Sequence, residues 1–280
     1  DGTLSILGGT GVGAIGMRAN SYNSTESTIV NRNLGELLIQ AGSYEQAYAI
    51  YANAESSSWY AIGNIQNYDE GTLSILGSSA HRSIGLFANA YGDYSARGNI
   101  INDGGGTLII QGGSGEDAYG ISYNAYATAS TNSIIMGVID NEAGELSIIG
   151  GDSKTAYGLY VNAFQLENLS GSNAYAEIYT MGSTLNILGN VASGIYVNAA
   201  NGAEGAITND GDGILNILGD KEKGSYAITC FTVGASTSRL ENYGTMNLNA
   251  NAIQQFVGSG TPTSISVVNY GTVNAEAEAI

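Results

Sequence analysis

The acidic residues with potential for chemistry recur at one place in a repeated pattern. Asp69, Asp103, Glu142, Asp210 and Asp212 stand just before a glycine that opens a new repeat. Two carboxylates cleave a glycosidic bond when they lie about 5 Å or about 6.5–9.5 Å apart across a sugar. Here the acids stand close to glycines, as in NDGDG, and Asp beside Gly favours a tight turn. We therefore interpret these acids as turn formers, and we expect the chain not to be an enzyme.

The chain has one histidine, His81, and one cysteine, Cys230. His81 lies in GSSAHRS, without the G-x-S-x-G pattern that would place a nucleophile for a catalytic triad. Cys230 lies in the apolar segment SYAITCF, where a buried thiol acts as a small hydrophobic group. We therefore assign no catalytic residue.

Two short segments contain the clustered oxygen atoms that calcium prefers. NDGDG spans residues 209–213, and GGSGED at 112–117 is a single imperfect copy of a calcium-binding nonapeptide. Solenoids that bind calcium in this way carry the nonapeptide in tandem, and this chain does not. We assign no metal ligand, no cofactor-binding residue and no cofactor.

The net charge of −17 comes from 25 acidic and eight basic residues. This sign disfavours nucleic acid and anionic lipid as partners, because both require Lys and Arg to neutralise phosphate. No apolar run approaches the roughly 18 residues of a membrane-spanning helix, so we expect no membrane insertion by this segment.

The elements that position these residues come from a phrase that returns nine times. It reads GTLSILG at Gly2 and at Gly71, and related forms occur elsewhere. Such self-similarity indicates a solenoid, whose units bury their apolar faces against one another. The first inward residues of the nine copies are Leu4, Leu37, Leu73, Leu108, Leu146, Leu185, Leu215, Met246 and Val273, at intervals of 27 to 39 residues.

Within each unit apolar and polar residues alternate, and Gly, Asn and Asp bound the alternating stretches, as expected for short strands. The sequence thus predicts an all-β fold, a single-stranded parallel β-helix (β-solenoid) of about eight or nine coils with three short strands each. We expect residues 1–280 to form one continuous solenoid that starts and ends in mid-repeat, as part of a longer chain or assembly. A WD40-type propeller is disfavoured because its signature is absent, and two coils per unit because the second half does not echo the first.

Two asparagine series occupy fixed positions in the repeat, and we predict that each stacks into a ladder at a corner. Stacked side-chain amides bond from coil to coil and stabilise stacked strands. Thr180 replaces Asn in one unit of the second series. Tyr48, Tyr119, Tyr157 and Tyr226 share another position and are also expected to stack. The first series, at the ends of apolar strands, is Asn20, Asn53, Asn89, Asn124, Asn162 and Asn198; the second is Asn31, Asn67, Asn102, Asn141, Asn209, Asn242 and Asn269.

Segments of variable length follow the first asparagine series and are rich in Ser, Tyr, Ala and Asn. Variable loops on one face of a rigid solenoid are common recognition sites, and this composition suits binding. The same residues would equally serve to extend the second and third strands. The candidate recognition residues are Trp59, Tyr60, Tyr91, Tyr94, Tyr126, Phe164 and Tyr175.

GTLSILGG, AYGLYVNA and I-x-N-x-G-x-L, with few Cys, Pro and Lys, resemble the passenger domains of Gram-negative autotransporters (type V secretion). The closing NYGTVNAEAEAI is similar to repeats of vacuolating-toxin-like autotransporters. The resemblance covers essentially the whole chain. It implies a right-handed β-helix that is secreted or lies on the outer-membrane surface of a Gram-negative bacterium, as an adhesin, aggregation factor or toxin.

We therefore expect a non-catalytic extracellular surface protein, an adhesin or structural passenger in cell adhesion or aggregation. Its expected partner is a host or sister-cell surface protein or glycan. The alternative is an extracellular filament subunit whose copies stack end to end by β-strand addition. A toxin and a polysaccharide-acting β-helix enzyme are weaker alternatives.

Overall fold

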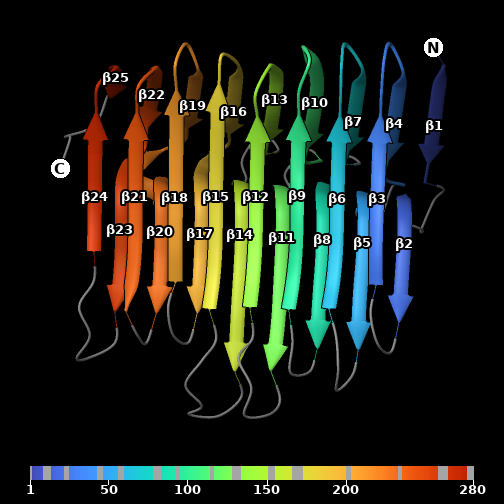
Figure 1. Cartoon of the computed structure of the whole chain (residues 1–280), viewed down its shortest axis with the longest axis horizontal. Coiled ribbons are helices and arrows are strands. Elements are labelled where there is room, and N and C mark those ends of the chain that lie inside the picture. Colours follow the sequence, from blue (N-terminus) through green and yellow to red (C-terminus); the bar gives the residue numbers. More distant parts are fainter. Residues whose placement is uncertain are drawn as a thin grey trace.

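Three parallel sheets run side by side along the molecule, and the two termini lie at opposite ends of its long axis (Figure 1). This arrangement comes from a computed structural model. It describes residues 2–8, 14–21, 25–42, 47–55, 60–77, 83–91, 95–113, 117–127, 134–150, 155–165, 173–199, 203–232, 235–257 and 264–275.

The phrase at the start of each repeat forms sheet A, which has nine strands. Equivalent residues pair across coils, as Leu73 does with Leu108 and Ile75 with Ile110. These inward side chains are fully buried, whereas Ser74 between them faces outward. In spatial order, the strands are β1 (Thr3–Leu7), β4 (Glu36–Gln40), β7 (Thr72–Leu76), β10 (Gly106–Gln111), β13 (Gly144–Ile149), β16 (Thr184–Leu188), β19 (Ile214–Leu218), β22 (Thr245–Asn249) and β25 (Thr272–Ala275).

The second strand of each coil belongs to sheet B, and its pairing with the next strand skips one small residue. Tyr119 and Ile121 of one strand pair with Tyr157 and Leu159 of the next, whereas Gly120 between them does not pair. A Cβ atom on Gly120 would lie 2.7 Å from the carbonyl oxygen of Gly158, so the close approach of the next strand requires glycine there. The strands, in order, are β2 (Ile15–Ser21), β5 (Ala47–Glu55), β8 (Ser83–Tyr91), β11 (Ala118–Ala127), β14 (Thr155–Gln165), β17 (Val191–Ala199), β20 (Tyr226–Thr232) and β23 (Asn251–Val257).

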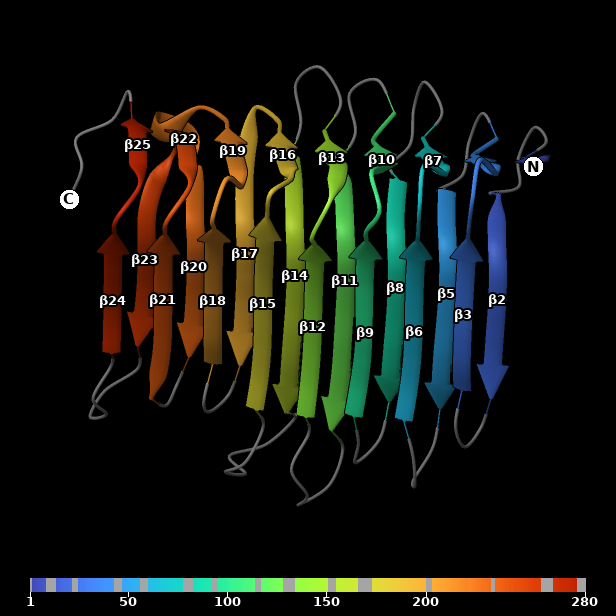
Figure 2. The same ribbon diagram turned by 45° about the horizontal axis from the view of Figure 1, so that its top comes forward.

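The third strand of each coil belongs to sheet C, which faces sheet B with its strands pointing the opposite way (Figures 1 and 2). A single 3-10 turn, η1 (Lys221–Lys223), is the one helical element in the described part of the chain. The strands of sheet C, in order, are β3 (Thr25–Asn31), β6 (Tyr60–Asn67), β9 (Ser95–Asn102), β12 (Ile134–Asn141), β15 (Asn173–Met181), β18 (Ala203–Asp210), β21 (Ser236–Asn242) and β24 (Ser264–Asn269).

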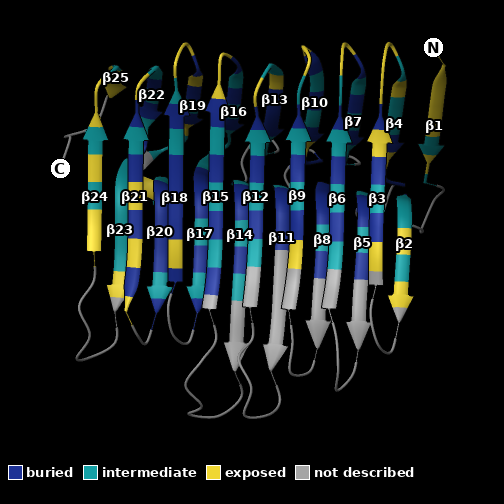
Figure 3. Ribbon diagram, viewed as in Figure 1, coloured by how far each residue is buried: buried dark blue, intermediate teal, exposed yellow. Residues whose placement is uncertain are grey.

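Ile, Leu, Val and Ala side chains from all three sheets form one continuous core. Cys230 belongs to it, as expected, and burial raises the pKa of its thiol. The central coils are the most buried, and the coils at both ends are the most exposed (Figure 3). The predicted β-solenoid with three strands per coil is confirmed. The strands of sheet B are longer than predicted, with up to 11 residues in β14.

Candidate functional site

The second asparagine series forms a buried ladder at the corner between sheets C and A. Asn31, Asn67 and Asn102 each donate from Nδ2 to the Oδ1 atom of the next asparagine, and all three distances are 2.9 Å. The ladder resumes further along, where Asn209 donates to Asn242 and Asn242 to Asn269, at 2.7 and 2.8 Å. The ladder predicted at this corner is confirmed.

The same amides also fix the turn into sheet A. Nδ2 of Asn102 donates to the carbonyl oxygen of Gly106 at 3.1 Å, and Asn67 does the same to Gly71 at 2.9 Å. A Cβ atom on Gly106 would lie 2.5 Å from Nδ2 of Asn67. The repeat glycine is therefore needed because the amide of the preceding coil occupies the space beside it.

Thr180 interrupts this ladder, and Ser183 stands where the other coils have glycine. Nδ2 of Asn141 donates to Oγ of Ser183 at 2.9 Å, and the two hydroxyls lie 2.7 Å apart. Two hydroxyl groups thus replace one carboxamide. Beyond the interruption, the buried Oδ1 of Asn209 has no hydrogen-bond partner among the described atoms.

The first asparagine series is in register from coil to coil, but it lies within the strands of sheet B. β14, for example, continues to Gln165, three residues beyond Asn162, so the expectation that this series ends its strands at a corner is wrong. Nδ2 of Asn198 donates to Oδ1 of Asn162 at 3.1 Å, and Asn20 is exposed. The side chains of Asn53, Asn89 and Asn124 lie outside the described residues.

Aromatic rings cover the outer face of sheet B. Tyr119 stacks on Tyr157, with ring centroids 5.2 Å apart, as predicted. The predicted single column is otherwise wrong, because Ile84 stands between Tyr48 and Tyr119, and Ser193 between Tyr157 and Tyr226.

Further stacked pairs on this face were not predicted. Each places an aromatic residue beside its counterpart in the next coil. Most of these residues stand two positions before the first asparagine series, a spacing that an alignment of the repeats displays. The pairs are Tyr51–Phe87 (5.1 Å), Tyr160–Tyr196 (5.0 Å) and Phe231–Phe256 (4.5 Å).

Few charged side chains are described on the outer face of sheet B. The carboxylate of Asp117, just before β11, accepts from the Tyr119 hydroxyl at 3.3 Å. Among the side chains described on its eight strands, Arg18 is the one charged group, and its guanidinium lies 5.4 Å from the ring centroid of Tyr51. Burial, followed by the charge of Asp117, raises the pKa of Tyr157 to about 12. Burial likewise raises the pKa values of Tyr160 and Tyr196. These hydroxyls therefore stay neutral well above neutral pH.

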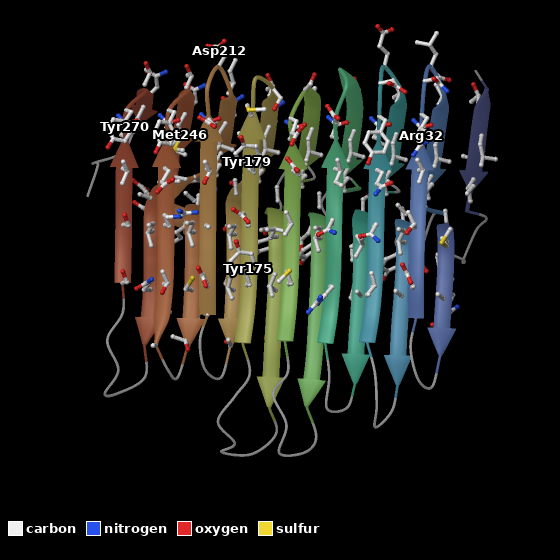
Figure 4. All side chains as sticks on the ribbon, viewed as in Figure 1. Arg32, Tyr175, Tyr179, Asp212, Met246 and Tyr270 are labelled. Carbon is white, nitrogen blue, oxygen red and sulfur yellow. The ribbon has the colours of Figure 1, made fainter. Side chains whose placement is uncertain are left out.

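Sheet C presents a contrasting, acidic face, on which Tyr175 and Tyr179 are labelled in Figure 4. The Tyr175 hydroxyl donates to Oε2 of Glu177 at 2.6 Å, and burial and this carboxylate raise the pKa of Tyr175. Burial, then the charges of Glu142, Asp103 and Glu177, raises the pKa of Asp140 to about 6.

A third amide ladder, not predicted as such, runs along the outer face of sheet A. Asn216 donates to Asn186 at 2.7 Å, Asn247 to Asn216 at 2.6 Å, and Asn274 to Asn247 at 2.7 Å. The asparagine in the middle of the phrase in the later repeats is the sequence signal for it.

The predicted turn acids make turn contacts. Asp103 Oδ1 accepts from the amide of Gly104 at 2.6 Å, Asp210 Oδ1 from that of Gly211 at 2.8 Å, and Asp69 has a positive φ of 59°. Glu142 and Asp212 are exposed at the same corner. Within the described residues, no group of three or more His, Cys, Asp and Glu side chains is placed to hold a metal ion. His81 lies outside the described residues.

The candidate recognition residues lie mostly in strands. Tyr60 opens β6, Tyr91 closes β8, and Tyr126, Phe164 and Tyr175 lie within β11, β14 and β15, so for these five the loop assignment is wrong. Tyr91, Tyr126 and Phe164 are in register with one another. Of the seven, only the Tyr175 side chain is described; Trp59 and Tyr94 lie wholly outside the described residues.

No protein-family model, curated protein or solved structure matches this chain. No helix in the described part of the chain is long and apolar enough to cross a membrane.

Proposed function

We propose that this chain is a non-catalytic extracellular surface protein of a Gram-negative bacterium that mediates cell adhesion or aggregation. The observation that carries the proposal is the outer face of sheet B, where aromatic side chains form stacked pairs on adjacent coils beside a series of amides in register. A rigid array of equivalent groups binds a repetitive surface with an avidity that exceeds each single contact. The resemblance to autotransporter passengers supports the location.

The proposal is tested with beads coated with the purified chain. Such beads should attach to epithelial monolayers, or to one another in suspension, far more than albumin-coated beads do. The variant Tyr160→Ala/Tyr196→Ala removes one stacked pair from sheet B and should reduce attachment. The matched variant Tyr175→Ala/Tyr179→Ala on sheet C should not. The proposed function would be contradicted if the coated beads attached neither to the monolayers nor to one another more than albumin-coated beads do.

A filament subunit is the second candidate function. The outermost described coils expose side chains of the inward type, with Leu4 59% and Val273 40% exposed. A further coil of any origin would cover them, and in a filament a second copy of the chain supplies it. Electron microscopy and sedimentation across a concentration series should then show fibres that lengthen with concentration. Particles of one fixed mass at every concentration would exclude this assembly.

A further inference from the structure

The outer face of sheet B, described above as an aromatic and amide surface with few described charges, has the chemistry to recognise one class of ligand. We propose that this face binds a neutral, extended polysaccharide that lies along the solenoid axis. The inference rests on the proposed adhesive function and names the partner of the same surface.

The distribution of charge favours a neutral ligand. The described side chains of the sheet B strands include a single charged group, Arg18, although the chain as a whole carries a net charge of −17. One carboxylate, Asp117, stands just before β11 and accepts from the Tyr119 hydroxyl at 3.3 Å. An anionic polymer would be repelled by the protein, and a cationic one would find its counter-charges on sheet C instead. The carboxylates described on the strands of sheet C are those of Glu26, Asp140, Glu177, Glu204, Asp210 and Glu241.

The rings supply apolar contact for the sugar. The centroids of Tyr160 and Tyr196 are 5.0 Å apart with planes 8° from parallel, and both side chains are half-buried. That separation exceeds the ~3.5–4.0 Å of direct carbon–carbon contact, and slipped stacks are the preferred geometry of such pairs. Slipped rings leave part of each face open to solvent. The C–H groups of a pyranose pack on such a face.

The asparagines beside the rings supply polar contacts at the same repeat. Asn198 uses one N–H on Asn162, so a second N–H remains, and a carboxamide oxygen accepts up to two hydrogen bonds. Strands lie about 4.8 Å apart, and at that interval β14 and β17 present two successive rings and two successive amides. Ser122 and Thr229 hold the ring position in the strands on either side of this pair. This interval is comparable to the advance of one residue in an extended β-1,4-linked glycan. The coils of β14 and β17 would therefore each meet one sugar unit.

Affinity gel electrophoresis of the whole chain tests the proposal with four soluble polymers. Hydroxyethyl cellulose and galactomannan, which are neutral with β-1,4-linked backbones, should retard the chain. Dextran, which is neutral and flexible, and polygalacturonate, which is anionic, should not. Equal migration with and without both β-1,4-linked polymers would overturn the proposal, as would retardation by polygalacturonate alone.

Variants locate the binding surface. Tyr160→Ala/Tyr196→Ala should weaken the retardation about tenfold. Tyr160→Phe/Tyr196→Phe, which keeps the rings, should retain most of it, and Tyr175→Ala/Tyr179→Ala on sheet C all of it. Asn162→Leu/Asn198→Leu removes the amides at similar side-chain size and should weaken retardation without lowering the thermal unfolding midpoint. Retardation that the sheet B variants leave unchanged would overturn the proposal.

Cell-binding measurements separate this inference from the function on which it rests. If beads attach to cells as strongly after glycosidases have removed neutral glycans from the cells, the partner is not a neutral glycan and the inference fails, while the adhesive function stands. If the purified polymers bind to sheet B but coated beads attach to no cell and to no other bead, the adhesive function fails and the binding site stands.

Discussion

The buried ladder at the corner of sheets C and A and the ladder on the outer face of sheet A use the same side chain in different surroundings. Asn102 donates to Asn141 at 2.9 Å and is fully buried, whereas Asn216 donates to Asn186 at 2.7 Å and is partly exposed. Asn102 also donates to the backbone oxygen of Gly106. Water replaces a lost partner at the surface but not in the interior, so similar geometry implies unequal contributions to stability.

The largest effect is expected at the centre of the buried ladder. Asn102→Leu removes three hydrogen bonds and leaves Nδ2 of Asn67 with only backbone acceptors. We expect the free energy of unfolding to fall by about 3 kcal/mol, because unpaired buried polar groups cost about 1–3 kcal/mol each. Urea titration followed by circular dichroism measures it. A loss no larger than that of Asn216→Leu would contradict the ranking of the two ladders.

A repair of the buried ladder tests the same comparison in the stabilising direction. Thr180→Asn/Ser183→Gly should place an amide where Oδ1 of Asn209 now lacks a partner, and we expect a gain of about 1 kcal/mol. Thr180→Asn alone should destabilise the protein, because Ser183 occupies the space that the amide needs. At the equivalent Gly213, a Cβ atom would lie 2.5 Å from Oδ1 of Asn209. A single substitution as stabilising as the pair would contradict this account.

Asp140 is half-buried, and its ionisation makes the stability of the fold depend on pH. Its pKa is raised from 3.8 to about 6 in the folded protein, so the ionised form destabilises the fold. Its contribution to stability is full below pH 3.8 and is lost as pH rises through 6. Relative to Asp140→Asn, the wild type should gain less than about 1 kcal/mol between pH 7 and pH 4, because solvent screens a group this exposed. Thermal unfolding of both proteins at pH 4, 5, 6 and 7 measures the difference, and parallel profiles would contradict it.

The smallest effect is expected on the outer ladder. Asn216→Leu removes the bonds to Asn186 and Asn247, but water reaches the groups left behind. We expect the free energy of unfolding to change by less than about 0.5 kcal/mol. The same urea titration, run beside Asn102→Leu, measures both members of the comparison under one condition. A loss above about 2 kcal/mol would show that the outer ladder supports the coils as strongly as the buried one.

Some features of the candidate surfaces could be read from single repeats, and others could not. The alternation of apolar and polar residues predicts that Leu73 and Ile75 point inward. The place of Asn102 shortly before the repeat glycine predicts its position at the corner. The prediction of a single tyrosine column was wrong because it treated Tyr48 and Tyr119 as neighbours, whereas Ile84 lies between them. The prediction that the first asparagine series ends its strands was also wrong. The strands of sheet B extend past these asparagines, and a single repeat does not show where a strand that packs against sheet C will end.

The sequence by itself determined the coil: a repeated phrase with inward Leu and Ile, a corner asparagine and a glycine beside it specify where each strand turns. Only the tertiary structure decided which faces the coils present. The stack of Tyr160 on Tyr196 joins residues 36 positions apart, as the pairing of Asn162 with Asn198 does. The separation of the face of sheet B, with its few described charges, from the acidic face of sheet C likewise arises when the coils align. Hydrogen bonding between strands sets that alignment in space, at about 4.8 Å per coil, whatever the number of residues between them.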